Sequence, residues 1–271
     1  MRTEYLELDF PQLAIAASLI VICSVISLVL QLGLQRRLLL AALRTVVQLL
    51  LVGLVLWWIF APERSSLFVV GMMGAMTLIA GFAAVDRTGH RYRGIRLDSI
   101  ISMWASSWLI TAVALFAVVQ VQRGEQPWYD PQYAIPLLGM ILGNTLNGIS
   151  LGLNRLGEEL ATKRRHVETL LALGATRWEA ARGPIQEAIR TGMIPIINSM
   201  MVVGLVSLPG MMTGQLLAGV PPVQAVRYQI VIMFLIAAGT SLGTFSVVLL
   251  GYRRMFTADH QFASARLTKR R

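Results

Sequence analysis

The chain has 271 residues, of which 55% are hydrophobic and 14% are charged, and its mean hydropathy is +0.63. Soluble domains carry about 25% charged residues, so this composition excludes an ordinary soluble domain and indicates a membrane protein. The formal net charge is +10. Because no basic patch is interleaved with aromatic residues, we do not expect nucleic acid as a partner. The single cysteine, Cys23, excludes an intramolecular disulfide.

Seven apolar stretches are long enough to cross a bilayer core of about 30 Å as helices. They cover residues 11–34, 38–60, 67–85, 99–121, 134–153, 192–208 and 228–252. The sequence therefore predicts an all-α, polytopic integral membrane protein with about seven transmembrane helices. The connections leave no room for a soluble domain, so we expect residues 1–271 to form one transmembrane domain. The acidic N-terminus, residues 1–9, does not suit a cleaved signal peptide, which predicts that the first span is retained.

The distribution of basic residues predicts the orientation in the membrane. Nineteen of the 24 Lys and Arg residues fall in connections that seven spans would place on one side. The four on the other side are Arg2, Arg64, Arg123 and Arg227. Because Lys and Arg mark the cytoplasmic side, we expect an outside N-terminus and a cytoplasmic C-terminus in the cell's inner (plasma) membrane. The same residues suit contact with anionic membrane lipid.

The longest cytoplasmic connection, residues 156–190, has the pattern of two helices joined by a tight turn. Apolar residues share one face of the first helix, expected over 158–173, and Gly174 suits the turn that ends it. Thr176 and Glu179 have the spacing of a capping box for the second helix, in which Pro184 would introduce a kink. From this pattern alone, a plain interfacial amphipathic loop is the alternative.

Polar residues and helix breakers within the apolar spans are candidates for a translocation pathway. A broken backbone at membrane depth is tolerated only where protein or a water-filled cavity satisfies it, and discontinuous helices often build transport sites. The alternative at the Pro209-Gly210 break is a simple helix end, and for Arg44 it is snorkelling to the interface. The candidates are Arg44, Gln48, Asn144, Asn147, Asn198, Ser199, Pro209, Gly210, Met211, Met212 and Gly214.

The sequence leaves any metal ligands unknown. Methionine thioethers suit soft cations, but methionine is also an ordinary apolar filler of helices. Less soft divalent cations suit imidazole or carboxylate ligands, and the three histidines all fall in segments expected to be cytoplasmic. The chain also has no G-x4-G-K-[S/T] motif. We therefore expect it to bind no cofactor itself and to hydrolyse no ATP.

Two sets of motifs resemble known families. Glu168, followed by Gly174 and Ala175-Thr176, resembles the E-x5-G core of the coupling loop in ABC-transporter permeases. Residues 172–176, Ala-Leu-Gly-Ala-Thr, resemble the equivalent turn in permeases of the FtsX/MacB type. The chain differs from the importer coupling loop in two ways. It has Thr169-Leu170 where that loop has Ala-Ala, and it lacks the downstream Ile-x-Leu-Pro. Over roughly residues 40–255 the chain resembles the FetB/YbbM family, with motifs at 44–53, 136–144, 193–199 and 204–230.

The resemblance implies the transmembrane subunit of an ABC transporter, a homodimer that works with a separate ATPase carrying ATP and Mg²⁺. It also implies export of a metal ion, iron, and assigns coupling to Glu168, Leu173, Gly174, Ala175, Thr176 and Glu179. Two alternatives stay open. One is an FtsX-like membrane protein that transmits motion without transport, although the outer connections are short for it. The other is a carrier driven by an ion gradient, although no acidic residue falls at mid-span.

Overall fold

The structure is a computed structural model that describes residues 9–59, 66–118, 130–257 and 259–269. Residues 1–8, Arg64, Arg123 and most of the connection 122–133 lie outside the described residues. The chain divides into two compact units, Met1–Arg64 and Ser65–Arg271. The single transmembrane domain expected from the sequence therefore stays a prediction.

The first unit is a helical hairpin of α1 (Phe10–Val29) and α2 (Gln35–Ile59). At the turn the backbone N–H of Leu34 donates to Ser27 Oγ at 3.1 Å, and Gly33 has a φ of +69°. Arg44 and Gln48 lie one turn apart on α2, where both side chains are exposed. The predicted spans 11–34 and 38–60 thus correspond to two helices with a short turn between them.

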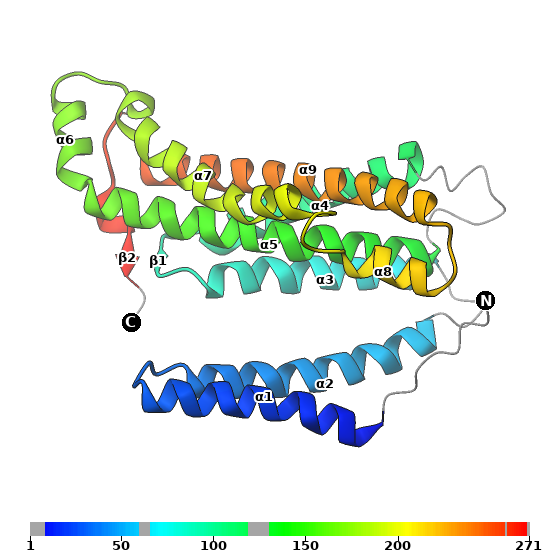
Figure 1. Cartoon of the computed structure of the whole chain (residues 1–271). Helices are drawn as coiled ribbons and strands as arrows, with labels where there is room; N and C mark the ends of the chain where they lie inside the picture. Colours follow the sequence, from blue (N-terminus) through cyan, green and yellow to red (C-terminus); the bar gives the residue numbers. More distant parts are fainter. Residues whose placement is uncertain (1–8, 60–65, 119–129, 258, 270–271) are drawn as a thin grey trace. The chain divides into compact units, whose positions relative to one another are not determined.

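The second unit is a bundle in which long helices run roughly side by side (Figure 1). Its helices are α3 (Ser66–Asp86), α4 (Ile95–Val113), which continues as a π-helical turn (Ala114–Val118), α5 (Pro131–Thr162), α6 (Arg164–Ala172), α7 (Arg177–Val202), α8 (Gly210–Leu217), α9 (Pro222–Met255) and a short 3₁₀ helix (Ser264–Arg266). Two short strands, β1 (His90–Arg91) and β2 (Thr268–Lys269), pair antiparallel with His90 opposite Lys269. The α3–α4 connection, α6 and the C-terminal segment lie at one end of the bundle, called here the α6 end (Figure 1).

The predicted class, a polytopic helical membrane protein, is confirmed. Among the described residues, six helices are long and apolar enough to cross a membrane: α1, α2, α3, α4, α5 and α9. The sixth predicted span, 192–208, is wrong in its boundaries, because α7 begins at Arg177 and ends at Val202, and α8 follows after a break. A total of seven crossings and the orientation of the termini stay predictions.

Helices α5, α7 and α9 touch where small residues face one another. A methyl group at Gly192 of α7 would lie 2.6 Å from Thr244 Cγ2 on α9 and 2.8 Å from the Gly148 carbonyl oxygen on α5. A methyl group at Gly148 would lie 2.5 Å from Thr244 Oγ1. In lipid, where apolar burial drives helix association weakly, such close backbone contact is a main source of packing energy. These positions therefore set the distances between the three helices.

An ion pair between a half-exposed arginine and a buried aspartate joins α4 to α9 at the α6 end. Asp98 is 1% exposed, and both of its carboxylate oxygens accept from Arg254 Nε, at 2.9 and 2.8 Å. The φ of Gly94 is +94°, and a side chain there would meet the Arg254 guanidinium at 2.8 Å. Gly94 thus gives the arginine room to reach the carboxylate, which would otherwise be a buried charge without a partner.

The glycine contact makes a prediction about stability. We expect Gly192→Ala to lower the free energy of unfolding by about 1–3 kcal/mol, because a methyl group there overlaps two neighbouring helices. Gly183→Ala, on the same helix with no atom within 4 Å of the added methyl, is the matched control and should be neutral or stabilising by up to about 1 kcal/mol. Thermal unfolding in mild detergent, followed by tryptophan fluorescence, measures both. Equal effects of the two substitutions would contradict the packing described.

Candidate coupling segment and translocation pathway

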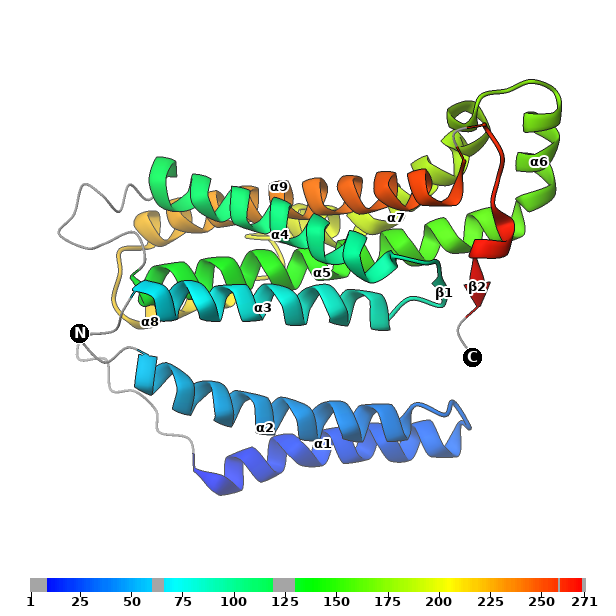
Figure 2. The ribbon, with the colours of Figure 1, turned by 180° about the vertical axis from the view of Figure 1, so that it is seen from behind.

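Helix α5 continues past the bundle and ends at Thr162, and α6 then runs in a different direction (Figures 1 and 2). The single helix expected over 158–173 is therefore wrong, because the chain breaks at Lys163. The change of direction brings α6 into contact with α7, and Val167 becomes fully buried. We attribute the break to this contact between α6 and α7, which overrides helix propensity and cannot be seen in the local sequence.

The turn between α6 and α7 has the predicted geometry. Gly174 has a φ of +91°, its N–H donates to the Leu171 carbonyl at 3.1 Å, and the Ala175 N–H donates to the Leu170 carbonyl at 3.0 Å. This is a Schellman motif, in which the left-handed residue is ordinarily glycine. The sequence prediction of a glycine turn at this position is confirmed.

The capping box at the start of α7 is also present. The Glu179 N–H donates to Thr176 Oγ1 at 3.3 Å, and the Thr176 N–H donates to Glu179 Oε2 at 2.7 Å. The N–H and then the hydroxyl of Thr176, which donates to Glu179 Oε2 at 2.8 Å, lower the pKa of the fully exposed Glu179 carboxyl. The ionised Glu179 carboxylate therefore contributes its full stabilisation of the folded state at neutral pH. This stabilisation is lost as the pH falls through the lowered pKa. Helix α7 then passes through Pro184 and Pro195 without ending.

The tip of this segment presents apolar side chains to solvent. Leu173 is 79% exposed, Ala172 and Gly174 are exposed beside it, and Trp178 at the base of α7 is 47% exposed. No atom lies within 4 Å of a methyl group placed on Gly174. Glu168, on α6, is half-exposed and pairs with Arg164 Nε at 2.7 Å. The predicted coupling residues thus lie together on a protruding surface that the described part of the chain leaves uncovered.

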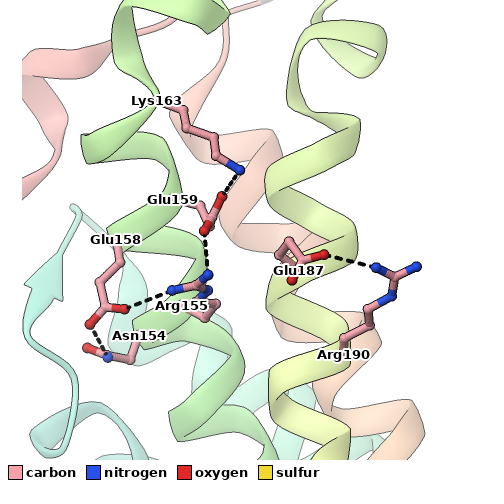
Figure 3. A network of polar contacts seen from close by, with 7 residues as sticks. All are labelled: Asn154, Arg155, Glu158, Glu159, Lys163, Glu187 and Arg190. Carbon is pink, nitrogen blue, oxygen red and sulfur yellow. Dashed lines mark hydrogen bonds and ion pairs between the residues drawn. The ribbon is translucent and has the colours of Figure 1, made fainter.

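A chain of polar contacts stiffens the end of α5 (Figure 3). The Glu159 side chain is almost fully buried, and its carboxylate pairs with Arg155 at 2.7 Å and with Lys163 at 2.6 Å. Asn154 Nδ2 donates to Glu158 at 2.7 Å, while Asn154 Oδ1 accepts from the backbone of the α3–α4 connection. The sequence analysis missed this set, although four-residue spacing of opposite charges on a helix is a usable signal.

The C-terminal segment contacts the base of α7. Trp178 stacks edge-on against Tyr252 with ring centroids 5.7 Å apart, and Tyr252 packs against Phe256 at 5.3 Å. The Arg177 N–H donates to His260 Nδ1 at 3.0 Å, and Arg177 Nη1 donates to a backbone carbonyl of the same segment at 3.3 Å. The start of α7 is therefore attached to the end of α9. The sequence analysis found no motif in this segment.

A polar pocket of about 280 Å³ surrounds one predicted pathway residue. It is lined by Arg87, Asn147, Ser150, Leu151, Asn154 and Pro195, from the end of α3 and from α5 and α7. Arg87 Nη1 donates to Asn147 Oδ1 at 2.9 Å. Asn144, one turn away, instead donates to the Met140 carbonyl of its own helix at 2.9 Å. Because Arg87 lines this pocket and bonds to Asn147, it becomes a further pathway candidate.

The break between α7 and α8 borders a second pocket. After Val202 the chain turns through Gly204, whose φ is +81°, and the Gly204 N–H donates to the Ser207 carbonyl at 2.9 Å. Beside it lies an apolar pocket of about 540 Å³ between this break, α8 and α9. Its lining includes Met200, Met212, Met233 and the buried Gln229.

The remaining pathway candidates lie around this break without lining the pocket. Pro209 is the N-cap residue of α8, and three further candidates lie in α8 itself: Gly210, Met211 and Gly214. Asn198 and Ser199 are exposed near the end of α7, where Ser199 Oγ donates to the Pro195 carbonyl at 2.9 Å. Among the described residues, no group of three or more His, Cys, Asp and Glu side chains is placed to hold a metal ion.

A family model matches residues 10–256, nearly the whole chain, and describes the uncharacterised protein family UPF0014. The chain belongs to this family. It is therefore a multi-pass membrane protein of the UPF0014 family, as the FetB/YbbM resemblance predicted.

Relatives from bacteria and plants match over most of their length. A UPF0014 membrane protein of Synechocystis sp. is 41% identical over 85% of this chain and 87% of its own. The probable iron export permease protein FetB of Escherichia coli is 33% identical over 95% of this chain and 96% of its own. Protein ALUMINUM SENSITIVE 3 of Arabidopsis thaliana is 29% identical over 91% of this chain and 88% of its own. No solved structure matches the chain significantly.

The capping box predicts local stability at the start of α7. We expect Thr176→Ala to cost about 1 kcal/mol and to speed amide exchange at 177–180 about fivefold, because the Glu179 N–H loses its acceptor and the Glu179 carboxylate loses the donor hydroxyl. Thr169→Ala is the matched control, since that exposed hydroxyl donates only to the Arg165 carbonyl within α6. Hydrogen exchange with mass spectrometry measures both variants. Unchanged protection in Thr176→Ala would mean that the cap does not hold this turn.

Proposed function

We propose that the chain is the transmembrane permease subunit of an ABC transporter in the cell's inner (plasma) membrane, and that a separate subunit hydrolyses the ATP. One observation carries this proposal: an exposed helix–turn–helix tip at Leu173 and Gly174 is built directly on α5 and α7, two of the central helices of the bundle. A short helix of this kind suits docking in a groove of a partner, with Leu173 as the apolar anchor.

Contacts connect the tip to three helices of the bundle, so movement of the tip would be passed to them. A push on α6 reaches α5 across the break at Lys163, where the Glu159 ion pairs hold the last turn of α5. It reaches α7 through the Gly174 turn and α9 through the contact of Trp178 with Tyr252. Since α5, α7 and α9 touch at the glycine contact, displacement of one requires the others to shift.

The proposed assembly contains two copies of this chain and two ATPase subunits, because the chain has one coupling segment and an ABC ATPase works as a pair. ATP and Mg²⁺ would bind to the partner subunit. This proposal differs from a transport-independent signalling role and from an ion-gradient carrier in requiring both a coupled ATPase and a transported substrate.

The name of the Escherichia coli relative supports metal export, with iron as the substrate to test. The two pockets offer amide, guanidinium and thioether groups. These groups do not form a ligand set for a bare iron ion, which prefers carboxylate or imidazole. A transported ion would therefore pass hydrated or chelated.

The docking proposal makes a prediction for Leu173. We expect Leu173→Asp to weaken the complex with the co-purifying ATPase by about 2 kcal/mol, roughly 30-fold in Kd, because a charge replaces the exposed apolar anchor. Gln186→Asp places the same charge on an exposed position of α7 further from the tip and should leave the complex unchanged. Titration of ATPase onto the permease in nanodiscs measures both. Equal affinities would refute docking at this tip.

The break at 203–209 makes a prediction about solvent access. In a Cys23→Ser background, we expect Met212→Cys to react with a membrane-impermeant thiol reagent added from outside, because Met212 lines the pocket beside the break. Leu217→Cys, exposed on the same short helix but not lining the pocket, is the comparison. We expect it to react at least several-fold more slowly, because an exposed apolar residue outside the pocket faces lipid. Inert cysteines at both positions would remove this break from the pathway.

A further inference from the structure

A second polar pocket lies at the α6 end, away from the coupling tip and the Asn147 pocket. Its volume is about 380 Å³, and it is lined by Tyr92, Arg93, Arg254 and Arg266. These residues come from the α3–α4 connection, the end of α9 and the C-terminal 3₁₀ helix. Three arginines thus line one concave space. Neither the coupling proposal nor the pathway proposal uses it.

Two of the three arginines are held in place by their own contacts. Arg254 is fixed by Asp98 on one side and by the Gly94 backbone beneath it. Arg266 Nη1 donates to the Arg254 carbonyl at 3.0 Å, and the strand that follows Arg266 pairs with β1, where Thr268 Oγ1 donates to the Arg91 carbonyl at 3.1 Å. Positioned guanidinium groups bind planar or tetrahedral oxyanions with less loss of side-chain entropy than free ones.

The pocket has an excess of positive charge. Asp98 is the carboxylate that pairs with Arg254, and neither Arg93 nor Arg266 has a carboxylate within 4.0 Å among the described residues. Gly94, next to Arg93, caps the N-terminus of α4, and no side chain caps that end. The α4 dipole adds partial positive charge there. Positive charges gathered in this way favour an anion between them, because guanidinium groups form strong charge-assisted hydrogen bonds with oxyanions.

The depth of the pocket indicates the source of the anion. Arg227 and Arg254 bound the apolar part of α9, and at about 1.5 Å per residue their Cα atoms are roughly 40 Å apart. This separation matches a bilayer including its headgroup layers. A helix of this length that crosses the bilayer along its normal would place Arg254 at the level of lipid phosphates. Basic pockets between helices at this depth are suited to anionic headgroups.

We propose that this pocket binds the phosphate group of an anionic phospholipid in the leaflet at the α6 end. The phosphate would bridge the start of α4, the end of α9 and the C-terminal segment, which also contacts the base of α7. This inference stands independently of the ATPase partner, because it concerns the chain alone.

The experiment uses the full-length chain in nanodiscs of phosphatidylcholine with increasing phosphatidylglycerol, and native mass spectrometry counts the phosphatidylglycerol that stays bound. The test variant is Arg93→Gln with Arg266→Gln. The control is Arg96→Gln with Arg253→Gln, which removes the same charge from exposed arginines that do not line the pocket. We expect about a tenfold loss of bound phosphatidylglycerol in the test variant and less than about threefold in the control. Arg93→Gln alone is a second test variant. Because Arg93 is exposed, we expect this single variant to fold normally.

Three outcomes would overturn the lipid assignment. Equal losses in the two double variants would mean that only general attraction to a basic surface is at work. If inorganic phosphate raises Tm in pure phosphatidylcholine through Arg93 and Arg266, with no preference for phosphatidylglycerol, the ligand is a free anion. If neither probe binds and the test variant instead loses a co-purifying protein, the pocket receives an acidic protein segment.

Discussion

Helices α5, α7 and α9 approach so closely at Gly148, Gly192 and Thr244 that none of the three can shift without the others. Lipid provides little hydrophobic drive for helix association, so this close contact carries much of the packing. The two polar features at the α6 end, the Glu159 ion pairs and the Asp98–Arg254 pair, then fix how the helices leave the bundle. The tip at Leu173 and Gly174 gains a defined position because it is built on α5 and α7, and because the start of α7 contacts α9.

The same packing explains how a surface event could reach the membrane interior. The tip is built on helices that continue through the glycine contact, and α7 ends at the Val202 break, beside the methionine-lined pocket. Under the proposed function, movement of the tip would pass along α7 to the point where this helix is interrupted. Because Trp178 at the start of α7 contacts Tyr252 of α9, the same proposal would have α9 move with α7.

Local chemistry made part of this structure predictable. A glycine after an amphipathic helix and a threonine three residues before a glutamate fix backbone hydrogen bonds among near neighbours, so Gly174 and Thr176 were found from the sequence. The break at Lys163 and the Asp98–Arg254 pair were not. The pair joins residues 156 positions apart, and no local pattern shows which arginine reaches a given carboxylate. Among the pathway candidates, the sequence named Asn147 and Met212, which line pockets in the structure. It did not name Arg87 and Gln229, because their places in these pockets depend on which helices pack together.

The central claim is that this chain works through a separate ATPase. Its most direct test is to purify the tagged chain from native membranes in mild detergent and identify the proteins that accompany it at stoichiometric amounts. The account predicts a P-loop ATPase at one copy per permease, with ATPase activity that responds to the transported metal. A chain that purifies alone, or with no partner carrying a P-loop, would contradict it.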